Sequence, residues 1–177
     1  MRLPDTSRRI VVDTNVARSA SESVHPVSDA CRRVLETMMS EQHRIVLSAT
    51  QFREWQKHQS GYSKNWLARM KAKNLWHVLT PEPDSGLTSR AHALDCTDKL
   101  RVEILKDMHL LENALATDHA VVSQETNVLA LFIAHAQPLQ IPRPVAWVNP
   151  AENPVVCIAW LEKGATIEAV PFVPAGI

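Results

Sequence analysis

The sequence has few cysteines and no long apolar run. Its three cysteines, Cys31, Cys96 and Cys157, lie far apart without a CxxC pair, and their odd number argues against a disulfide framework and a zinc site. We therefore expect a reducing compartment, the cytoplasm. No segment approaches the roughly 18 apolar residues that a membrane-spanning helix needs, and no apolar stretch follows the basic residues near the start. We expect neither a membrane span nor an export signal.

The sequence also lacks an excess of charge of either sign. Lys and Arg together number 19, as do Asp and Glu, so the formal net charge is zero. This excludes a global positive field that would attract nucleic acid, and any RNA binding would depend on a local basic patch. With 177 residues, of which 45% are hydrophobic, the chain suffices for one domain with a sizeable core. We expect that domain at 1–165, followed by a C-terminal tail at 166–177.

Short apolar runs alternate along the chain with stretches of helical periodicity. Strands are predicted at 10–12, 45–47, 120–122 and 145–148. Helices are predicted between them, and the segment 98–116 fits either one long helix or two short helices that meet near Lys106 and Asp107. The alternation predicts an α/β fold with three layers (α/β/α) and a central, mainly parallel sheet of about four to five strands.

Acidic residues stand where the predicted strands and helices join. Asp13 directly follows the first strand, Glu54 lies in the first turns of the helix after the second, and Glu125 comes just after the third. Asp107 would open a helix that leads into the third strand. Ligands of parallel sheets bind outside the carboxyl ends of the strands, and clustered carboxylates repel one another until a hard cation such as Mg²⁺ or Mn²⁺ neutralises them. The pattern predicts a divalent metal site.

Each of these acids also has a purely structural interpretation. Asp13 alone would serve equally well as a helix N-cap, and Glu54 and Asp107 as first-turn acids favoured by the helix dipole. An acid at every one of these junctions is what favours a metal site. Two other acids are left out of the site, because Glu112 lies on a different helix face from Asp107 and Asp118 lies in the turn before the third strand.

Four segments together resemble the PIN-domain ribonucleases, including toxin-type members of bacterial toxin–antitoxin pairs. They are VVDTNV, LSATQFREW, KDMHLLENALATDHAVVSQE and WVNP, and the likeness covers roughly residues 9 to 150. The resemblance assigns the metal site to Asp13, Glu54, Asp107 and Glu125, and gives Asn15 and Ser123 supporting roles in orienting carboxylates or water. The chain departs from the family at Glu125, where the family usually has Asp.

The resemblance implies a metal-dependent endoribonuclease in which Mg²⁺ or Mn²⁺ activates water to cleave RNA phosphodiester bonds. Single-stranded or loop RNA is the expected substrate. Toxin-type relatives imply a small antitoxin protein and a homodimer as partners, with the exposed C-terminal segment PFVPAGI or the basic helix as a contact surface. Glu125 keeps open the alternative of a catalytically degenerate PIN-like module that binds RNA or protein. A more distant alternative is a phosphatase with Asp13 as nucleophile, although Asn15 stands where such enzymes have a second Asp.

The most basic predicted helix, from Tyr62 to Lys73, is a candidate RNA-binding surface. Its basic side chains are Lys64, Arg69, Lys71 and Lys73. Trp66 or Tyr62 would stack on a base in that case, whereas an ordinary amphipathic helix would bury Trp66 in the core. His109, beside the predicted metal site, would either contact phosphate or lie on a solvated helix surface.

Overall fold

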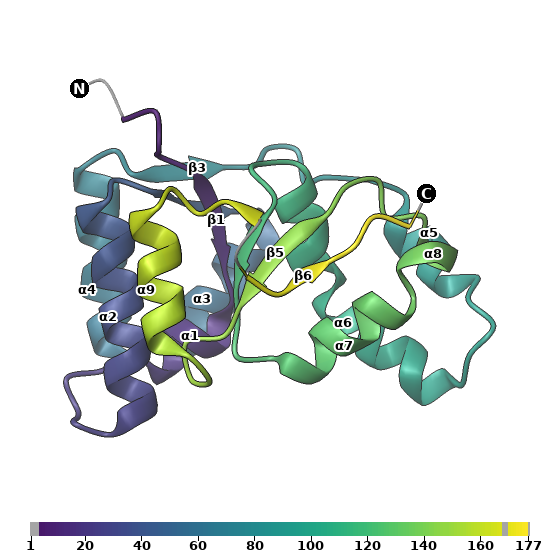
Figure 1. Ribbon diagram of the computed structural model, residues 1–177, viewed down its shortest axis with the longest axis horizontal. Coiled ribbons are helices and arrows are strands. Elements are labelled where there is room, and N and C mark those ends of the chain that lie inside the picture. Colours follow the sequence, from purple (N-terminus) through teal and green to yellow (C-terminus); the bar gives the residue numbers. More distant parts are fainter. Residues whose placement is uncertain (1–3, 168–169, 177) are drawn as a thin grey trace.

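The computed structural model describes residues 4–167 and 170–176. These residues contain one sheet with the strand order β3-β2-β1-β4-β5-β6 (Figure 1). The strands are β1 (Arg9–Val12), β2 (Arg44–Leu47), β3 (Trp76–Val78), β4 (Ala120–Val122), β5 (Val145–Val148) and β6 (Phe172–Val173). All neighbours pair in parallel except β5 and β6, which are antiparallel. The predicted α/β fold with a mainly parallel sheet is confirmed, with six strands instead of four to five.

Helices cover both faces of this sheet. They are α1 (Thr14–Ser19), α2 (Pro26–Ser40), α3 (Ala49–His58), α4 (Gly61–Ala72), α5 (Leu87–His92), α6 (Asp98–Leu115), α7 (Thr126–Ala134), α8 (Ala136–Leu139) and α9 (Pro154–Glu162). Alternate strand residues face opposite sides, so Ile10 and Val12 join the core under α1 to α4 and α9, whereas Val11 joins the core under α5 to α8. Burial on both faces explains why the central strands are continuous apolar runs.

The sequence did not predict two of the strands, β3 and β6. In β3, Trp76 and Val78 are exposed, at 36% and 49%, so this edge strand lacks the apolar signature of a buried one. The strand β6 has only two residues and lies in the segment expected to be a tail. That segment is not wholly detached, because Val173 is fully buried beside β5.

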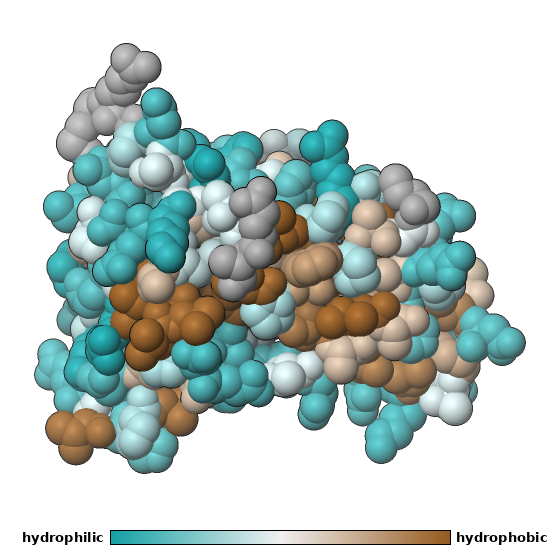
Figure 2. Space-filling model, viewed as in Figure 1, coloured by the Kyte–Doolittle hydropathy of each residue, from teal (hydrophilic) through white to brown (hydrophobic). Residues whose placement is uncertain are grey.

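Apolar side chains remain on the face formed by α9, β6 and α7 (Figure 2). Val155 on α9 is 70% exposed, Phe172 on β6 is 44% exposed and Ile133 on α7 is 45% exposed. The predicted exposure of the C-terminal segment therefore holds for Phe172 but not for Val173. None of the helices in the described part of the chain has the length and apolar character needed to cross a membrane.

The segment 98–116 forms one helix, and the expectation that Asp107 opens a helix is wrong. The helix α6 begins after its N-cap Thr97, whose side chain accepts a hydrogen bond from the backbone of Leu100. Ile104, Met108 and Leu111 continue the buried stripe past Asp107, and the helix contains neither Gly nor Pro to interrupt it. Asp107 therefore lies in the middle of a long helix and projects from its side.

Candidate functional site

A cavity of about 340 Å³ opens at the carboxyl ends of β1, β2 and β4. All four acids predicted as metal ligands line it, because the segments that follow these strands converge with the middle of α6. The lining residues are Asp13, Thr14, Asn15, Arg18, Thr50, Glu54, His58, Lys106, Asp107, His109 and Glu125. The cavity thus brings together residues that lie more than one hundred positions apart in the chain.

The end of β1 holds Asp13 at the floor of the cavity. The backbone N–H of Asp13 donates to the carbonyl of Val122 across the sheet, at 2.9 Å. The carbonyl of Val12 accepts two hydrogen bonds from α3, at 2.7 Å from Gln51 Nε2 and at 3.0 Å from Trp55 Nε1. Both polar groups of the peptide bond between Val12 and Asp13 are therefore hydrogen-bonded. These bonds fix the backbone from which the Asp13 side chain projects.

Ser123 ties the Asp13 carboxylate to the loop that carries Glu125. Its hydroxyl donates to Asp13 Oδ2 at 2.7 Å and accepts a hydrogen bond from the backbone N–H of Glu125 at 3.0 Å. Asp13 occupies the N-cap position of α1, yet its side chain makes no capping hydrogen bond. The Asn15 backbone nevertheless lies close enough to lower the pKa of Asp13, so a capping role stays open beside the contact with Ser123, which lies where a supporting residue was predicted.

Asn15 connects the same two segments through a second set of hydrogen bonds. Its Oδ1 accepts from the backbone N–H of Gln124 at 3.2 Å, and its carbonyl accepts from Gln124 Nε2 at 3.3 Å. Asn149, in the WVNP segment, donates from Nδ2 to the Gln124 carbonyl at 3.1 Å. The loop that carries Glu125 is thus held from both neighbouring strands. Sequence reasoning missed Gln124, whose role depends on contacts between distant segments.

Burial and like charge raise the pKa of the two acids deepest in the cavity. Asp13 is 8% exposed, and its burial raises the pKa of the carboxyl, although the Ser123 hydrogen bond acts against this. Asp107 is 7% exposed, and burial first and the charge of Asp13 second raise its pKa to about 6. Glu125 adds to both shifts. Ionising both of these buried carboxylates at once costs free energy unless a cation binds near them.

The acid contributed by α3 lies nearer the mouth of the cavity. The Glu54 side chain is 47% exposed, and its Oε2 lies 3.6 Å from Nε2 of His58, one turn further along the helix. Thr50, Glu54 and His58 share one face of α3 and form one wall. Glu54 therefore belongs to the rim, whereas Asp13 and Asp107 form the floor.

Basic side chains from three helices complete the rim. Arg18 of α1 and Lys106 of α6 are exposed, and His58 of α3 faces Glu54. His109 is only partly exposed, and burial lowers its pKa while the charge of Asp13 acts in the opposite sense. His109 therefore does not lie on a solvated helix surface. A cavity with acids at the floor and cations at the mouth suits a metal ion and a bound anion.

The basic residues predicted to contact RNA do not line this cavity. Lys71 Nζ lies 4.5 Å from the ring centroid of Phe52 and 4.9 Å from that of Trp76, and Arg69 pairs with Glu36 at 3.2 Å. Lys64 on the same helix and Lys73 directly after it are exposed. Trp66 is fully buried, and its Nε1 donates to the Leu35 carbonyl at 2.8 Å. The alternative of an amphipathic helix with Trp66 in the core is confirmed.

The two acids that sequence analysis left out are indeed engaged elsewhere. Glu112 accepts a hydrogen bond from the Ser85 hydroxyl at 3.0 Å and also contacts Thr88, beneath α5. Asp118 lies in the turn before β4 and binds Arg9 at the opposite end of the sheet. Neither lines the cavity.

The described acids that line the cavity do not form a closed cage for a metal ion. Within residues 4–167 and 170–176, no group of three or more His, Cys, Asp and Glu side chains is placed to hold a metal ion. Mg²⁺, however, usually keeps several waters and takes one or two carboxylates together with substrate phosphate. Asp13 and Asp107 are the two buried carboxylates of the cavity that are candidates for this smaller role.

Comparison of the chain with protein-family models finds no match, and comparisons with curated proteins and with solved structures find none either. The resemblance of four segments to the PIN-domain ribonucleases therefore remains a prediction from the sequence.

Proposed function

We propose that the protein is a metal-dependent endoribonuclease of the PIN type that hydrolyses RNA phosphodiester bonds with Mg²⁺ or Mn²⁺. The observation that carries the proposal is the pairing of Asp13 and Asp107 at the floor of one cavity. Both carboxylates are more than nine-tenths buried, and the charge of one raises the pKa of the other. Buried acids that repel one another are uncommon in proteins unless they bind a ligand.

In this proposal Asp13 and Asp107 hold the cation, and Ser123 keeps the Asp13 carboxylate oriented through its 2.7 Å hydrogen bond. Glu54 and Glu125 lie further out and receive waters of the hydrated ion. When bound, the divalent ion supplies a nucleophile by lowering the pKa of water and offsets charge on the phosphoryl group. Asn15 supports the site indirectly, because it fixes the loop of Glu125 through Gln124.

The cations at the mouth indicate how substrate would bind. Arg18 and Lys106 come from two different helices, α1 and α6, and would contact phosphates that flank the scissile bond. These residues replace Lys64, Arg69, Lys71 and Lys73 as our proposed RNA contacts, because none of those four lines the cavity. Single-stranded or loop RNA suits such a site, since its bases can be splayed away from the backbone.

The test is cleavage of an end-labelled RNA with single-stranded and hairpin segments, in Mn²⁺ or Mg²⁺ and in EDTA. We expect Asp13→Asn and Asp107→Asn each to remove metal-dependent cleavage while the circular dichroism spectrum stays unchanged. The matched control is Glu103→Gln, an exposed acid one turn before Asp107 on the same helix. Full activity of both asparagine variants would refute the assignment of the ligands.

A PIN-like module that binds RNA or protein without cleaving is the second candidate. It is favoured by the sparse arrangement of possible metal ligands among the described residues and by Glu125 at the position where the family usually has Asp. Calorimetric titration with Mn²⁺ separates the two. Binding that is lost in Asp13→Asn supports the nuclease, and no binding at millimolar Mn²⁺ supports the inert module.

The scattered cysteines lead us to propose a reducing cytoplasmic setting, and the resemblance leads us to propose a homodimer and a small antitoxin partner. All three cysteines are free, and Cys31 and Cys157 are buried. The apolar face around Val155 and Phe172 (Figure 2) offers a contact surface. Light scattering on the purified chain and on Phe172→Glu tests the dimer, because the substitution would produce a monomer if this face is the interface.

A further inference from the structure

The position of Glu125 in the cavity depends on its backbone. Its carboxylate makes no hydrogen bond or salt bridge with any residue in the described ranges 4–167 and 170–176. Its backbone N–H donates to the Ser123 hydroxyl at 3.0 Å, and its carbonyl accepts from the backbone N–H of Leu129 at 3.2 Å, in the first turn of α7. A Glu side chain has one more rotatable bond than an Asp side chain, so its reach depends on how firmly the loop before α7 is held.

Gln124, which precedes Glu125, uses both N–H groups of its side-chain amide. Its Nε2 donates to the Asn15 carbonyl at 3.3 Å and to Sγ of Cys31 at 3.0 Å. A carbonyl only accepts, so a flipped amide would turn its own oxygen against that of Asn15. The two contacts therefore hold the amide in one orientation, and they restrain the residue that leads into Glu125.

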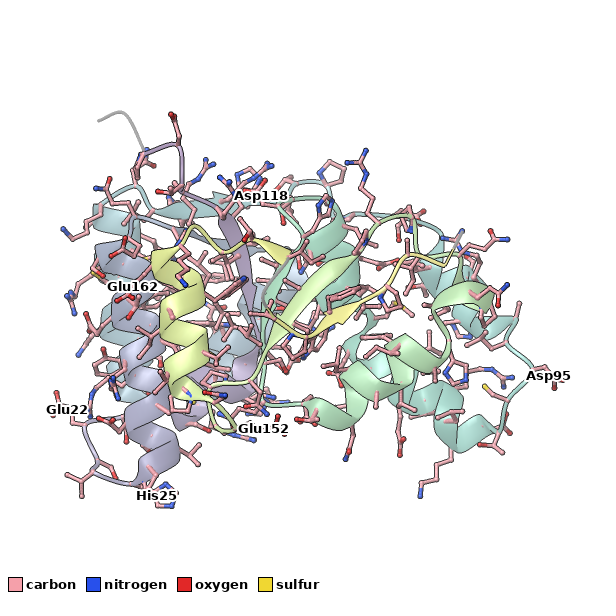
Figure 3. The ribbon with its side chains drawn as sticks, in the orientation of Figure 1. Glu22, His25, Asp95, Asp118, Glu152 and Glu162 are labelled. Atoms are coloured by element: carbon pink, nitrogen blue, oxygen red, sulfur yellow. The ribbon has the colours of Figure 1, made fainter. Side chains whose placement is uncertain are left out.

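Cys31 extends this network to a helix that does not line the cavity. It lies in α2, where its side chain is fully buried in a core that also contains Cys157 of α9. Figure 3 shows α2 beside α9, the helix between the labelled Glu152 and Glu162. Burial raises the pKa of the Cys31 thiol to about 11, although the Gln124 hydrogen bond acts against this, so the group stays a neutral thiol. Close packing of the core fixes the sulfur in place as an acceptor.

We propose that Cys31 and Gln124 are positioning residues of the cavity, because the sulfur of Cys31 holds the Gln124 amide and this residue holds Glu125 at the cavity wall. The inference rests on the proposed function, in which Glu125 receives waters of the hydrated ion. Asn15 and Asn149 fix the same loop from the segments after β1 and β5, whereas Cys31 fixes it from α2. Packing of the core around α2 therefore acts on the site through one hydrogen bond.

The first test compares Cys31→Ala with Cys157→Ala, which removes a second buried sulfur from the same core but not the partner of Gln124. Both variants should lose similar stability in urea, because both leave a small cavity. We expect only Cys31→Ala to speed hydrogen exchange of the Glu125 backbone N–H in EDTA, by about fivefold for one lost hydrogen bond. It should also weaken Mn²⁺ binding in calorimetry by about tenfold, as loss of a residue that orients a metal ligand does. Cys157→Ala should leave both quantities unchanged.

Two further variants separate the hydrogen bond from the volume of the side chain. Gln124→Met keeps the length of this half-buried side chain but removes its amide, so it should reproduce both effects of Cys31→Ala. Cys31→Ser keeps an acceptor beside the Gln124 amide and should restore slow exchange and Mn²⁺ affinity. Serine would not rescue a role confined to core packing, because its hydroxyl is harder to bury than a thiol.

The exchange and binding measurements also separate this inference from the nuclease activity. If the unmodified chain binds no Mn²⁺, the proposed function fails, and the exchange rates still decide whether Cys31 holds Glu125. The proposal is overturned if the Glu125 N–H exchanges as slowly in Cys31→Ala and Gln124→Met as it does in Cys157→Ala. It is also overturned if the unmodified chain binds Mn²⁺ and both variants bind it equally tightly.

Discussion

The hydroxyl of Ser123 donates a 2.7 Å hydrogen bond to Oδ2 of Asp13. The two residues follow neighbouring parallel strands, β1 and β4, and both are almost completely buried. An ionised carboxylate at this depth needs such a donor, because burial raises its pKa and favours the neutral form. The contact therefore stabilises the ionised form of the Asp13 carboxyl at the floor of the cavity.

Ser123→Ala removes this donor and should weaken Mn²⁺ binding by about 10- to 100-fold, as loss of a residue that orients a metal ligand usually does. The backbone N–H of Glu125 also loses its acceptor, so the loop that carries Glu125 should become less ordered. Calorimetric Mn²⁺ titration is the measurement, with Ser89→Ala on the exposed side of α5 as the control. Equal affinity in both variants would show that Ser123 does not support the site.

Asp107 should make the stability of the metal-free protein depend on pH. Its pKa is about 6 in the folded chain and near 4 in an unfolded one, so the folded state holds the proton more tightly. This contribution is complete below about pH 4 and is lost as the pH rises through about 6. Urea unfolding in EDTA at several pH values should therefore show that the stability difference between the unmodified chain and Asp107→Asn changes across this interval. A constant difference would contradict the raised pKa.

The sequence was sufficient to find the acids of the cavity but not their geometry. Asp13 and Glu125 were found because each directly follows a short apolar strand, and parallel strands present their carboxyl ends at one edge. The position of Asp107 was misjudged, because the continuity of α6 depends on Ile104 and Met108 packing against the sheet. That packing is a tertiary effect which local periodicity does not contain.

The basic surface that the sequence indicated does not line the cavity. The basic residues between Lys64 and Lys73 lie close together in the sequence, so the sequence alone shows them as a cluster of positive charge. Arg18 and Lys106 belong to different helices and meet only after the sheet has formed. The strands β3 and β6 were missed for a related reason, because short edge strands with exposed residues such as Trp76 and Phe172 carry no burial pattern.

Trp66 should contribute to stability and not to RNA binding. Trp66→Phe keeps most of the apolar surface but leaves the Leu35 carbonyl without its 2.8 Å hydrogen bond, which should cost about 1–3 kcal/mol. Denaturant unfolding measures this loss, and anisotropy with single-stranded RNA should give an unchanged affinity. If a fully folded Trp66→Phe variant bound RNA more weakly, this result would indicate that α4 forms the RNA-binding surface.

Arg18 and Lys106 should govern the salt dependence of RNA binding at the cavity. Each phosphate contact on a single strand contributes about 0.7 to the slope of log K against log salt concentration, so Arg18→Gln and Lys106→Gln should each reduce that slope by about this amount. The binding is measured by anisotropy in the Asp13→Asn background, which prevents cleavage. The controls are Lys64→Gln on α4 and Lys73→Gln directly after it, both exposed and outside the cavity. The slope depends on all phosphate contacts, wherever they occur on the protein. If the Lys64 and Lys73 variants reduced the slope and the Arg18 and Lys106 variants did not, the RNA would bind at α4 and not at the cavity.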